Sequence, residues 1–361
     1  MANINIQLFS DVIMKNLFQN NLFMYVGTDH SKFVTYLNGD GSQKSAALVH
    51  VPSAGNLPVI TKNRSIFPVN GIQRTDSDLT YNINEYSTAP WMLQYSEAVT
   101  VEYSKVESLL KEMNETILDT VGNETAYAWA PSSATTFGVT RIFRTTGPTG
   151  STALASGATG TRKSMSLNDF AIAKNLLDSD KFPTSERYFI IPSSIWNLDI
   201  LQLSNVQKFL ELGSKSGLRE GQIDPQTIPG RLGRIYGFEV IERPTVVVYL
   251  TGATPVLQTI GDNGVPTASN ATDNQGAIFF HKSAVANAIG QPVLFYNENR
   301  ADYFGSLFSA LIRHGASPLY STGQVSDFRG IGAIVQINIS KITKPKMREG
   351  VKFLSSFFLN K

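Results

Sequence analysis

The chain contains no cysteine among its 361 residues. Disulfide bonds and thiolate chemistry are therefore excluded, and stability must come from packing and assembly. No apolar run approaches the ~18–20 residues that a helix needs to span a bilayer, so we expect no membrane partner. The first residues, MANINIQLFSD, lack a basic region followed by an apolar core, so we also expect no secretory signal.

Charge is sparse as well, at 17% of the residues with a net charge of +2. A balance this close to neutral argues neither for nor against a nucleic-acid partner. Low charge is what extensive contact between subunits would produce, while the 42% hydrophobic content is ordinary for a globular protein. A chain of this length can bury a substantial core, and we expect two lobes rather than one.

Signatures of catalysis and metal binding are missing. The chain has four scattered histidines: His30, His50, His281 and His314. None lies at metal-ligand spacing from another, and neither a nucleophile elbow nor a phosphate-binding loop occurs. Asp76 and Asp78 lie in a turn-like stretch and would bind a cation weakly. We therefore expect a structural protein, with no catalytic residues, no metal and no cofactor.

The clearest single element covers residues 104–122. Ser104 followed by Glu107 is a capping-box start, and Gly122 supplies a permissive stop. Behind the cap, apolar residues recur at helical spacing: Val106, Leu109, Leu110, Met113, Ile117, Leu118 and Val121. The pattern predicts a long amphipathic helix with one buried face.

An extended hairpin precedes this helix, between about Leu48 and Tyr86. Residues 79–83 alternate with period two, and Asn70 followed by Gly71 offers a tight turn. At ~3.3 Å per residue each leg reaches ~50 Å or more. A two-stranded hairpin alone is marginal in water, so two readings stay open: it folds back on its own domain, or it lies on a neighbouring subunit.

The second half alternates helix and strand signals. Ser166 and Asp169 start a helix that Pro183 closes. We expect further strands at 187–192, 237–241, 245–250 and 277–280, and helices at 195–212 and 283–289. This order suggests a mixed sheet with helices against it.

Four segments lie outside that pattern. A short helix over residues 10–23 reads as an arm, and strands over 304–312 and 332–339 most simply return to the lobe of the long helix. Residues 341–361 hold six Lys or Arg against one Glu, with an apolar cluster. Such a tail docks on its own fold or contacts a partner protein, nucleic acid or lipid surface.

The order of parts is arm, extended hairpin, long helix, glycine-rich link, α/β lobe and late strands. In that order the chain resembles the major capsid protein of tailed bacteriophages, the Hong Kong-type head fold shared with encapsulins. The stretches that carry the resemblance are TVEYSKVESLLKEMNETILDTVGNETAYAWAP (100–131), SLNDFAIAKNLLD with RYFIIPSSIWNLDIL, GFEVIERPTV (237–246), GAIFFHKSAVANAI (276–289) and RADYFGSLFSALIRHGASPLYSTGQVSDFRGIGAI (300–334). These are patterns rather than invariant catalytic signatures, and they are most specific taken in order.

The resemblance implies an α+β fold with five parts. They are the N-terminal arm 1–46, the extended loop 47–90, the peripheral lobe 91–165 and 300–340 with its spine helix at about 104–122, the axial lobe 166–299, and the basic amphipathic tail 341–361. In this family the extended loop lies over the adjacent subunit. Its implied subunit-contact candidates are Lys62, Arg64, Ile66 and Phe67. Some relatives cross-link subunits through a lysine in this loop, but no partner for Lys62 can be assigned, so we predict no bond.

The implied function is a non-enzymatic shell subunit. Hexamers and pentamers would close into an icosahedral head around double-stranded DNA, with nonspecific DNA contact. A separate scaffolding protein, a portal and minor or decoration proteins would be partners. The chain would be assembled in the bacterial cytoplasm and reside in the virion. The alternatives are an encapsulin-like compartment, a soluble α/β enzyme or binding protein, and a tail or portal component.

Overall fold

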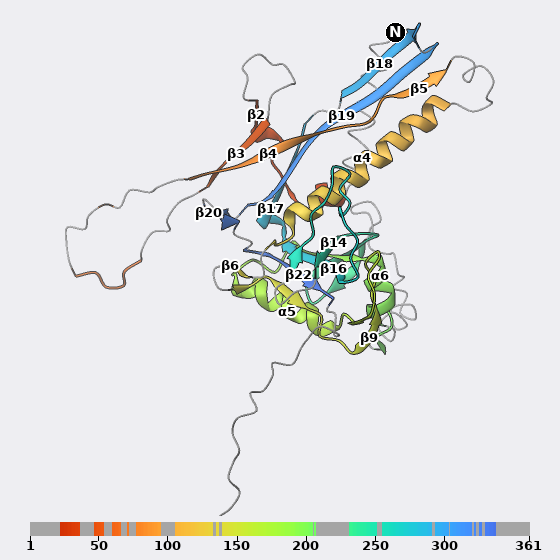
Figure 1. Ribbon diagram of the computed structural model, residues 1–361. Helices are drawn as coiled ribbons and strands as arrows, with labels where there is room; N and C mark the ends of the chain where they lie inside the picture. Colours follow the sequence, from red (N-terminus) through yellow and green to blue (C-terminus); the bar gives the residue numbers. More distant parts are fainter. Residues whose placement is uncertain are drawn as a thin grey trace, which may run out of the picture.

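The computed structural model describes residues 22–36, 47–53, 60–65, 71, 77–94, 105–132, 135–136, 139–204, 206, 231–250, 255–290, 293–302, 304–319, 321–322, 325–326 and 329–336. In this part of the chain one long helix, α4 (Lys105–Trp129), joins two eight-stranded sheets. Figure 1 shows α4 running beside one sheet and ending at the lobe that holds the other. The described fold is therefore elongated along the helix.

The first sheet has β19 at its centre. Its strands are β1 (Thr28–Asp29), β17 (Val285–Ile289), β19 (Gly305–Pro318), β4 (Ser77–Ser87), β3 (Ala47–Ser53) and β2 (Val34–Tyr36) in that order, with β18 (Val293–Arg300) and β5 (Trp91–Gln94) also paired to β19. Alternate β19 residues such as Phe308 and Ile312 share a buried cluster with Met113, Ile117 and Val121 of α4. The apolar stripe of the helix thus covers one face of this sheet.

The second sheet is buried on both faces. Its strands are β12 (Arg231–Ile235), β13 (Phe238–Arg243), β11 (Arg187–Pro192), β16 (Asp273–His281), β14 (Val247–Leu250) and β15 (Val256–Leu257), with β22 (Ile331–Val335) pairing β16 and β8 (Ile142–Arg144). Along β11, Ile190 belongs to the cluster at the C-terminal end of α4, while Phe189 and Ile191 belong to the cluster of helix α5 (Leu167–Ser179). Period-two alternation therefore supplies both cores.

Short elements complete the described fold. They are α2 (Leu22–Val26), the 3-10 turns Ser31–Phe33 and Lys282–Ala284, α6 (Ser193–Ile195) with a π-helical turn at Trp196–Ile200, and the ribbons β6 (Thr135–Thr136) with β7 (Val139–Thr140), β9 (Thr149–Thr152) with β10 (Thr161–Lys163), and β20 (Ser321–Thr322) with β21 (Val325–Ser326). None of the helices described is both long and apolar enough to cross a membrane.

Several predicted elements are confirmed. The hairpin legs pair antiparallel, from Ala47 opposite Ile83 to Ser53 opposite Ser77. The cap of α5 is also present, since the Ser166 backbone N–H donates to Asp169 Oδ2 at 2.8 Å. Strand 187–192 is observed with the expected bounds as β11. The local signals that predicted these elements therefore agree with their tertiary surroundings.

The long helix ends later than predicted. Gly122 was expected to stop it, yet α4 continues to Trp129. The glycine serves packing instead, because a Cβ at position 122 would lie 2.7 Å from the guanidinium of Arg243. That guanidinium donates to Asn123 Oδ1 at 2.7 Å and approaches Asp119 Oδ1 at 3.2 Å. Ser104, the expected cap, lies outside the described residues.

The helix predicted at 283–289 is wrong. Residues 283–289 form the end of a 3-10 turn and then strand β17, which is buried between β1 and β19. Its alanines are small because the strand is packed closely by its neighbours. Alanine is also the strongest helix former, so the sequence of this strand resembles that of a helix. The helix expected at 195–212 is confirmed at its start, because α6 ends at Ile195 and a π-helical turn over Trp196–Ile200 follows it. Residues 204 and 206 are also helical, and most of the remaining residues lie outside the described part.

The late strands divide between the two sheets. β19 pairs with β4 and β17 beside α4, as expected. β22 pairs with β16 and β8 in the second sheet, and its Ile331, Ala333 and Val335 share a buried cluster with the C-terminal end of α4, so this strand contacts both the long helix and the second sheet. All five residues of β22 are buried, and a wholly apolar strand fits best in a sheet covered on both faces. Most of the predicted arm helix and the whole tail, 341–361, lie outside the described residues.

Candidate functional site

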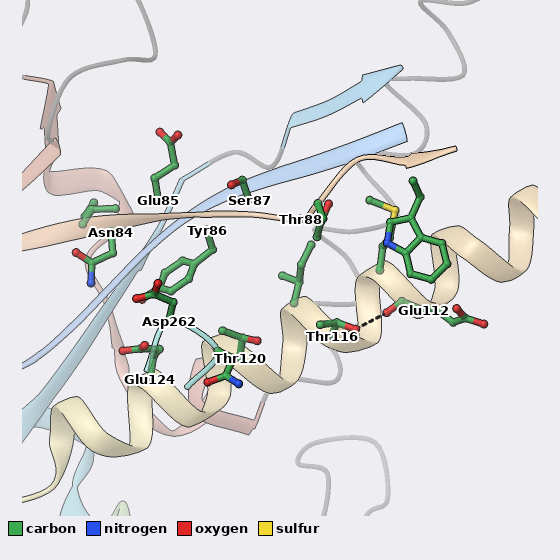
Figure 2. A pocket seen from close by; sticks show the side chains of 16 residues that line it. Asn84, Glu85, Tyr86, Ser87, Thr88, Glu112, Thr116, Thr120, Glu124 and Asp262 are labelled. Carbon is green, nitrogen blue, oxygen red and sulfur yellow. Dashed lines mark hydrogen bonds between the residues drawn. The ribbon is translucent and has the colours of Figure 1, made fainter. Parts of the chain in front are cut away.

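A groove separates α4 from the base of the hairpin strand β4. It has a volume of about 930 Å³, and Figure 2 shows the side chains that line it. The lining residues are Ile83, Asn84, Glu85, Tyr86, Ser87, Thr88, Ala89, Trp91, Glu112, Met113, Thr116, Ile117, Thr120, Glu124, Asp262 and Asn263. Three segments that are distant in sequence therefore build this site.

The pleat of β4 decides which of its side chains enter the groove. In Figure 2, Tyr86 points toward the helix, whereas Glu85 and Ser87 point away from it. On that opposite side, Glu85 accepts from the guanidinium of Arg313 at 3.1 and 3.2 Å. The carboxylates that remain on the helix side of the groove are Glu112, Glu124 and Asp262.

Asp262 reaches the groove from a polar excursion that leaves the second sheet after β15. Gly264, beside it, has a φ of 69°, a left-handed conformation that glycine adopts without strain. A Cβ at this position would lie 2.8 Å from the Cβ of Asn123 and 3.1 Å from the Thr120 carbonyl oxygen. The excursion thus packs closely against α4 and sets Asp262 opposite Glu124, as Figure 2 shows.

Burial and like charge shape the electrostatics at this end of the groove. The pKa of Glu124 is raised, first by burial and then by the negative charge of Asp262. The pKa of Tyr86 is raised by burial, and Glu124 raises it further. An added cation would relieve the repulsion between the carboxylates. The site therefore favours positively charged ligands.

Apolar side chains are exposed at the far end of the first sheet. Trp91 is 49% exposed, Phe295 52% and Phe304 82%. Phe295, Leu307 and Pro90 also line a shallow depression of about 290 Å³. Exposed aromatic residues gathered on one end of a sheet are typical of contact surfaces.

The predicted contact residues lie on the projecting hairpin. Lys62 and Arg64 are exposed, and the Arg64 guanidinium donates to Thr61 Oγ1 at 3.4 Å. Ile66 and Phe67 lie outside the described residues. Sequence reasoning missed the neighbouring Ile60, whose side chain is 93% exposed. Ile60 follows Val59 and Pro58 and precedes Thr61, and this short stretch carries no periodic pattern that would have identified an exposed side chain.

A cross-strand pair holds the hairpin legs together. His50 Nδ1 on β3 lies 2.7 Å from Asp78 Oδ2 on β4. His50 is opposite Thr80 and Asp78 is opposite Pro52, so the two side chains meet diagonally. Both residues had been noted singly, but only the strand register brings them together.

The histidines of the described residues lie in structural positions. No group of three His, Asp or Glu among the described residues could hold a metal ion. His314 is wholly buried, and burial lowers its pKa to about 3, so it stays neutral near pH 7. His281 accepts from the Ser283 backbone N–H at 3.2 Å in a local turn. These histidines support the fold in the part of the chain described.

Comparison with solved structures identifies the fold. Over 87% of both chains, the chain is similar to a structure titled "Capsid structure of the Cyanophage P-SCSP1u", with a TM-score of 0.54 and 13% identity. It is similar to the "Capsid of Ralstonia phage GP4", with a TM-score of 0.51, 13% identity, and 81% and 83% coverage. The capsid structure of Helicobacter pylori bacteriophage KHP30 gives a TM-score of 0.51 at 12% identity, with 87% and 90% coverage. No protein-family model and no curated protein matches the chain. The predicted α+β fold, that of phage capsid proteins, is confirmed.

Proposed function

We propose that this chain is the major capsid protein of a tailed bacteriophage, a non-enzymatic subunit of its shell. The observation that carries the proposal is the likeness to a cyanophage capsid structure over 87% of both chains. At 13% identity this likeness concerns the fold, and a fold alone does not fix a function. Surfaces of this chain supply the further support.

The first support is the projecting hairpin. Figure 1 shows β3 and β4 extending to the side of the first sheet, away from α5 and the second sheet. The described residues 60–65 beyond these strands are all exposed. Burying them against a sister subunit would stabilise a limb that has little core of its own.

The second support is the exposed apolar end of the first sheet, with Trp91, Phe295 and Phe304. Stable interfaces bury at least ~1,000 Å² in total. A shell offers each copy several such interfaces, so many modest contacts together hold the lattice. The hairpin and this sheet end lie at different edges of the fold (Figure 1), as contacts to different neighbours require.

The finer organisation follows as part of the proposal. Residues 1–46 form an arm, 47–90 the extended loop, 91–165 and 300–340 the peripheral lobe, and 166–299 the axial lobe. Hexamers and pentamers of this unit enclose double-stranded DNA, which interior Lys and Arg contact without sequence preference. A separate scaffolding protein, a portal and decoration proteins take part, and assembly occurs in the host cytoplasm.

Within the loop, Lys62, Arg64, Ile66 and Phe67 contact the adjacent subunit. The exposed cations Lys62 and Arg64 are available to carboxylates of that neighbour. Ile60, which is exposed in the single chain, is buried on assembly together with Ile66 and Phe67. Removing both charges therefore weakens assembly without affecting the isolated fold.

Electron microscopy and sedimentation of the purified chain, alone and with a candidate scaffold, test the proposal. We expect closed shells of uniform diameter from the wild type, and mostly unassembled chains from the Lys62→Glu, Arg64→Glu double variant. Lys181→Glu, an exposed charge reversal after α5, is the matched control and should assemble normally. A wild-type chain that stays a stable monomer at high concentration would refute the proposal. Nuclease-protected DNA in particles from the native source separates a phage head from an enzyme-filled compartment.

A further inference from the structure

The described side chains that line the groove between α4 and β4 carry negative charge and no positive charge. Its helix-side carboxylates are Glu112, Glu124 and Asp262, and no described lining residue is Lys or Arg. Glu124 and Asp262 face each other, as Figure 2 shows, and their repulsion contributes to the raised pKa of Glu124. A ligand that brings positive charge would relieve this repulsion.

The same groove also has apolar walls. Met113 and Ile117 line it from the helix, and Tyr86 and the half-exposed Trp91 line it from the strands. Aromatic faces attract cations as well as apolar groups. The groove therefore suits a peptide that carries both lysines and apolar side chains, rather than a bare inorganic cation.

Residues 341–361 of this chain have that chemistry. They hold six Lys or Arg against one Glu, together with an apolar cluster. Lys344, Lys346 and Arg348 stand at alternate positions, with Pro345 between the first two. In an extended segment alternate side chains share one face, and a residue before proline is biased toward extended backbone. The three cations would then span ~13 Å on one side.

The carboxylates of the groove span a somewhat longer distance. Glu112 and Glu124 are twelve positions apart on α4, which corresponds to ~18 Å along the helix axis, and Asp262 lies opposite Glu124. Lys and Arg side chains are long and flexible, so cations whose backbones span ~13 Å can reach Glu112 at one end and the pair Glu124 and Asp262 at the other.

The tail is also long enough to reach it. The described part of the chain ends at Gln336, directly after Val335, which shares a buried cluster with Trp129 at the end of α4. From Trp129 to Glu112 the helix runs ~25 Å. An extended segment from 336 to 348 covers ~40 Å, so Arg348 can reach the far carboxylate within one chain.

We propose that the basic tail, residues 341–361, docks in the groove between α4 and β4 of its own chain, with Lys344, Lys346 and Arg348 against Glu112, Glu124 and Asp262. The docked tail connects the base of the hairpin to the long helix. This intramolecular contact does not depend on the proposed shell function.

Zero-length cross-linking with a carbodiimide tests the proposal on the full-length protein. The reagent joins a lysine amine and a carboxylate as an amide. The water that this condensation releases adds to the carbodiimide, which becomes a urea. Mass spectrometry should find Lys344 or Lys346 joined to Glu112, Glu124 or Asp262. With isotope-labelled and unlabelled chains mixed before assembly, every such link should lie within one chain.

Charge-reversal variants test the electrostatic basis. Glu124→Lys with Asp262→Lys should lower the yield of the links to Glu112 about fivefold, as expected for two modest ion pairs. Glu115→Lys is the matched control, because Glu115 lies on the same helix, is exposed and pairs with Lys111; it should leave the yield unchanged. Lys344→Arg with Lys346→Arg keeps the charge and removes the amines, so these links should disappear.

Three results would overturn the proposal. One is a link from Lys62, or from any lysine outside the tail, as the main product in the groove. Another is tail links that join labelled to unlabelled chains, which would mean that a second copy supplies the tail. The last is tail lysines linked only to carboxylates elsewhere. Each of these cross-linking results can be obtained whether or not the chain forms shells. Failure of the docking proposal can therefore be distinguished from failure of the proposed function, which is read from shell formation.

Discussion

Trp129 of α4 contacts three other elements of the fold, so the effect of substitutions at its contacts on the free energy of unfolding can be predicted. Its side chain is fully buried at the end of α4. The ring meets Phe23 of α2 edge-on at 5.4 Å and Phe280 of β16 at 5.1 Å between centroids. Its indole N–H donates to the Ala286 carbonyl of β17 at 3.0 Å. Gly27, directly after α2, lies close to the same ring.

The Gly27→Ala variant introduces an overlap with this ring. A Cβ at position 27 would lie 2.7 Å from Cη2 and 2.8 Å from Cζ2 of Trp129, where ordinary contacts begin at 3.4 Å. A ring buried on all sides cannot move by that amount without disturbing its neighbours. Overpacking of this kind costs about 1–3 kcal/mol, so we expect Gly27→Ala to destabilise the chain by about 2 kcal/mol.

The Trp129→Phe variant removes the two clashing atoms and the indole N–H. The lost hydrogen bond costs about 1 kcal/mol, and the lost ring atoms leave a cavity that costs a further 1–2 kcal/mol, roughly. We therefore expect a loss of about 2–3 kcal/mol. In the double variant the new methyl group enters the space that the indole vacated.

The double variant tests the reasoning, because the two costs should not add. We expect it to be more stable than the sum of the single effects by about 1–2 kcal/mol, the size of coupling seen between residues in contact. Denaturant unfolding of unassembled chains, followed by circular dichroism, measures this. Gly71→Ala is the control, since a Cβ there meets no described atom within 4 Å. Additivity within about 0.5 kcal/mol would show that Gly27 does not pack on Trp129 as described.

Two further predictions concern buried charge. Arg162 is fully buried and donates to Asn274 Oδ1 at 2.6 Å and to the Asp273 carbonyl at 3.1 Å; Arg162→Met should cost about 3 kcal/mol in denaturant unfolding, with Lys163→Met as the control. Burial lowers the pKa of His314 to about 3, so as pH falls below ~6.5 only the unfolded chain gains its proton. Stability should therefore fall by about 3 kcal/mol more between pH 6.5 and 4 in the wild type than in His314→Gln, and equal slopes would contradict this; His50→Gln is the control.

The elements that the sequence predicted correctly are those whose signals are local. The Ser166 cap needs only the carboxylate of Asp169 three residues later. The hairpin legs need only their own alternation, and their register follows once they pair. In each case the residues that define the element also lie next to each other in space.

Predictions failed where a residue type served two purposes. Gly122 carries the signal of a helix end, but it makes room for the guanidinium of Arg243, which is more than a hundred residues away. Ala286 and Ala288 favour a helix by propensity, but they lie in a strand paired on both sides. Their side chains are buried in one cluster with the hairpin residues Val49, Tyr81 and Ile83, which leaves room only for small side chains. No window of local sequence contains these partners.

The groove shows the same limit for function. Its carboxylates stand at positions 112, 124 and 262, and the third comes from a loop after β15 that lies more than a hundred positions from the other two in the sequence. The left-handed backbone of Gly264 allows that loop to lie against α4. Burial first, and then the negative charge of Asp262, raise the pKa of Glu124, so a cation in the groove would favour the ionised form of this carboxylate. The basic tail that we propose to dock there would supply such a cation from within the same chain.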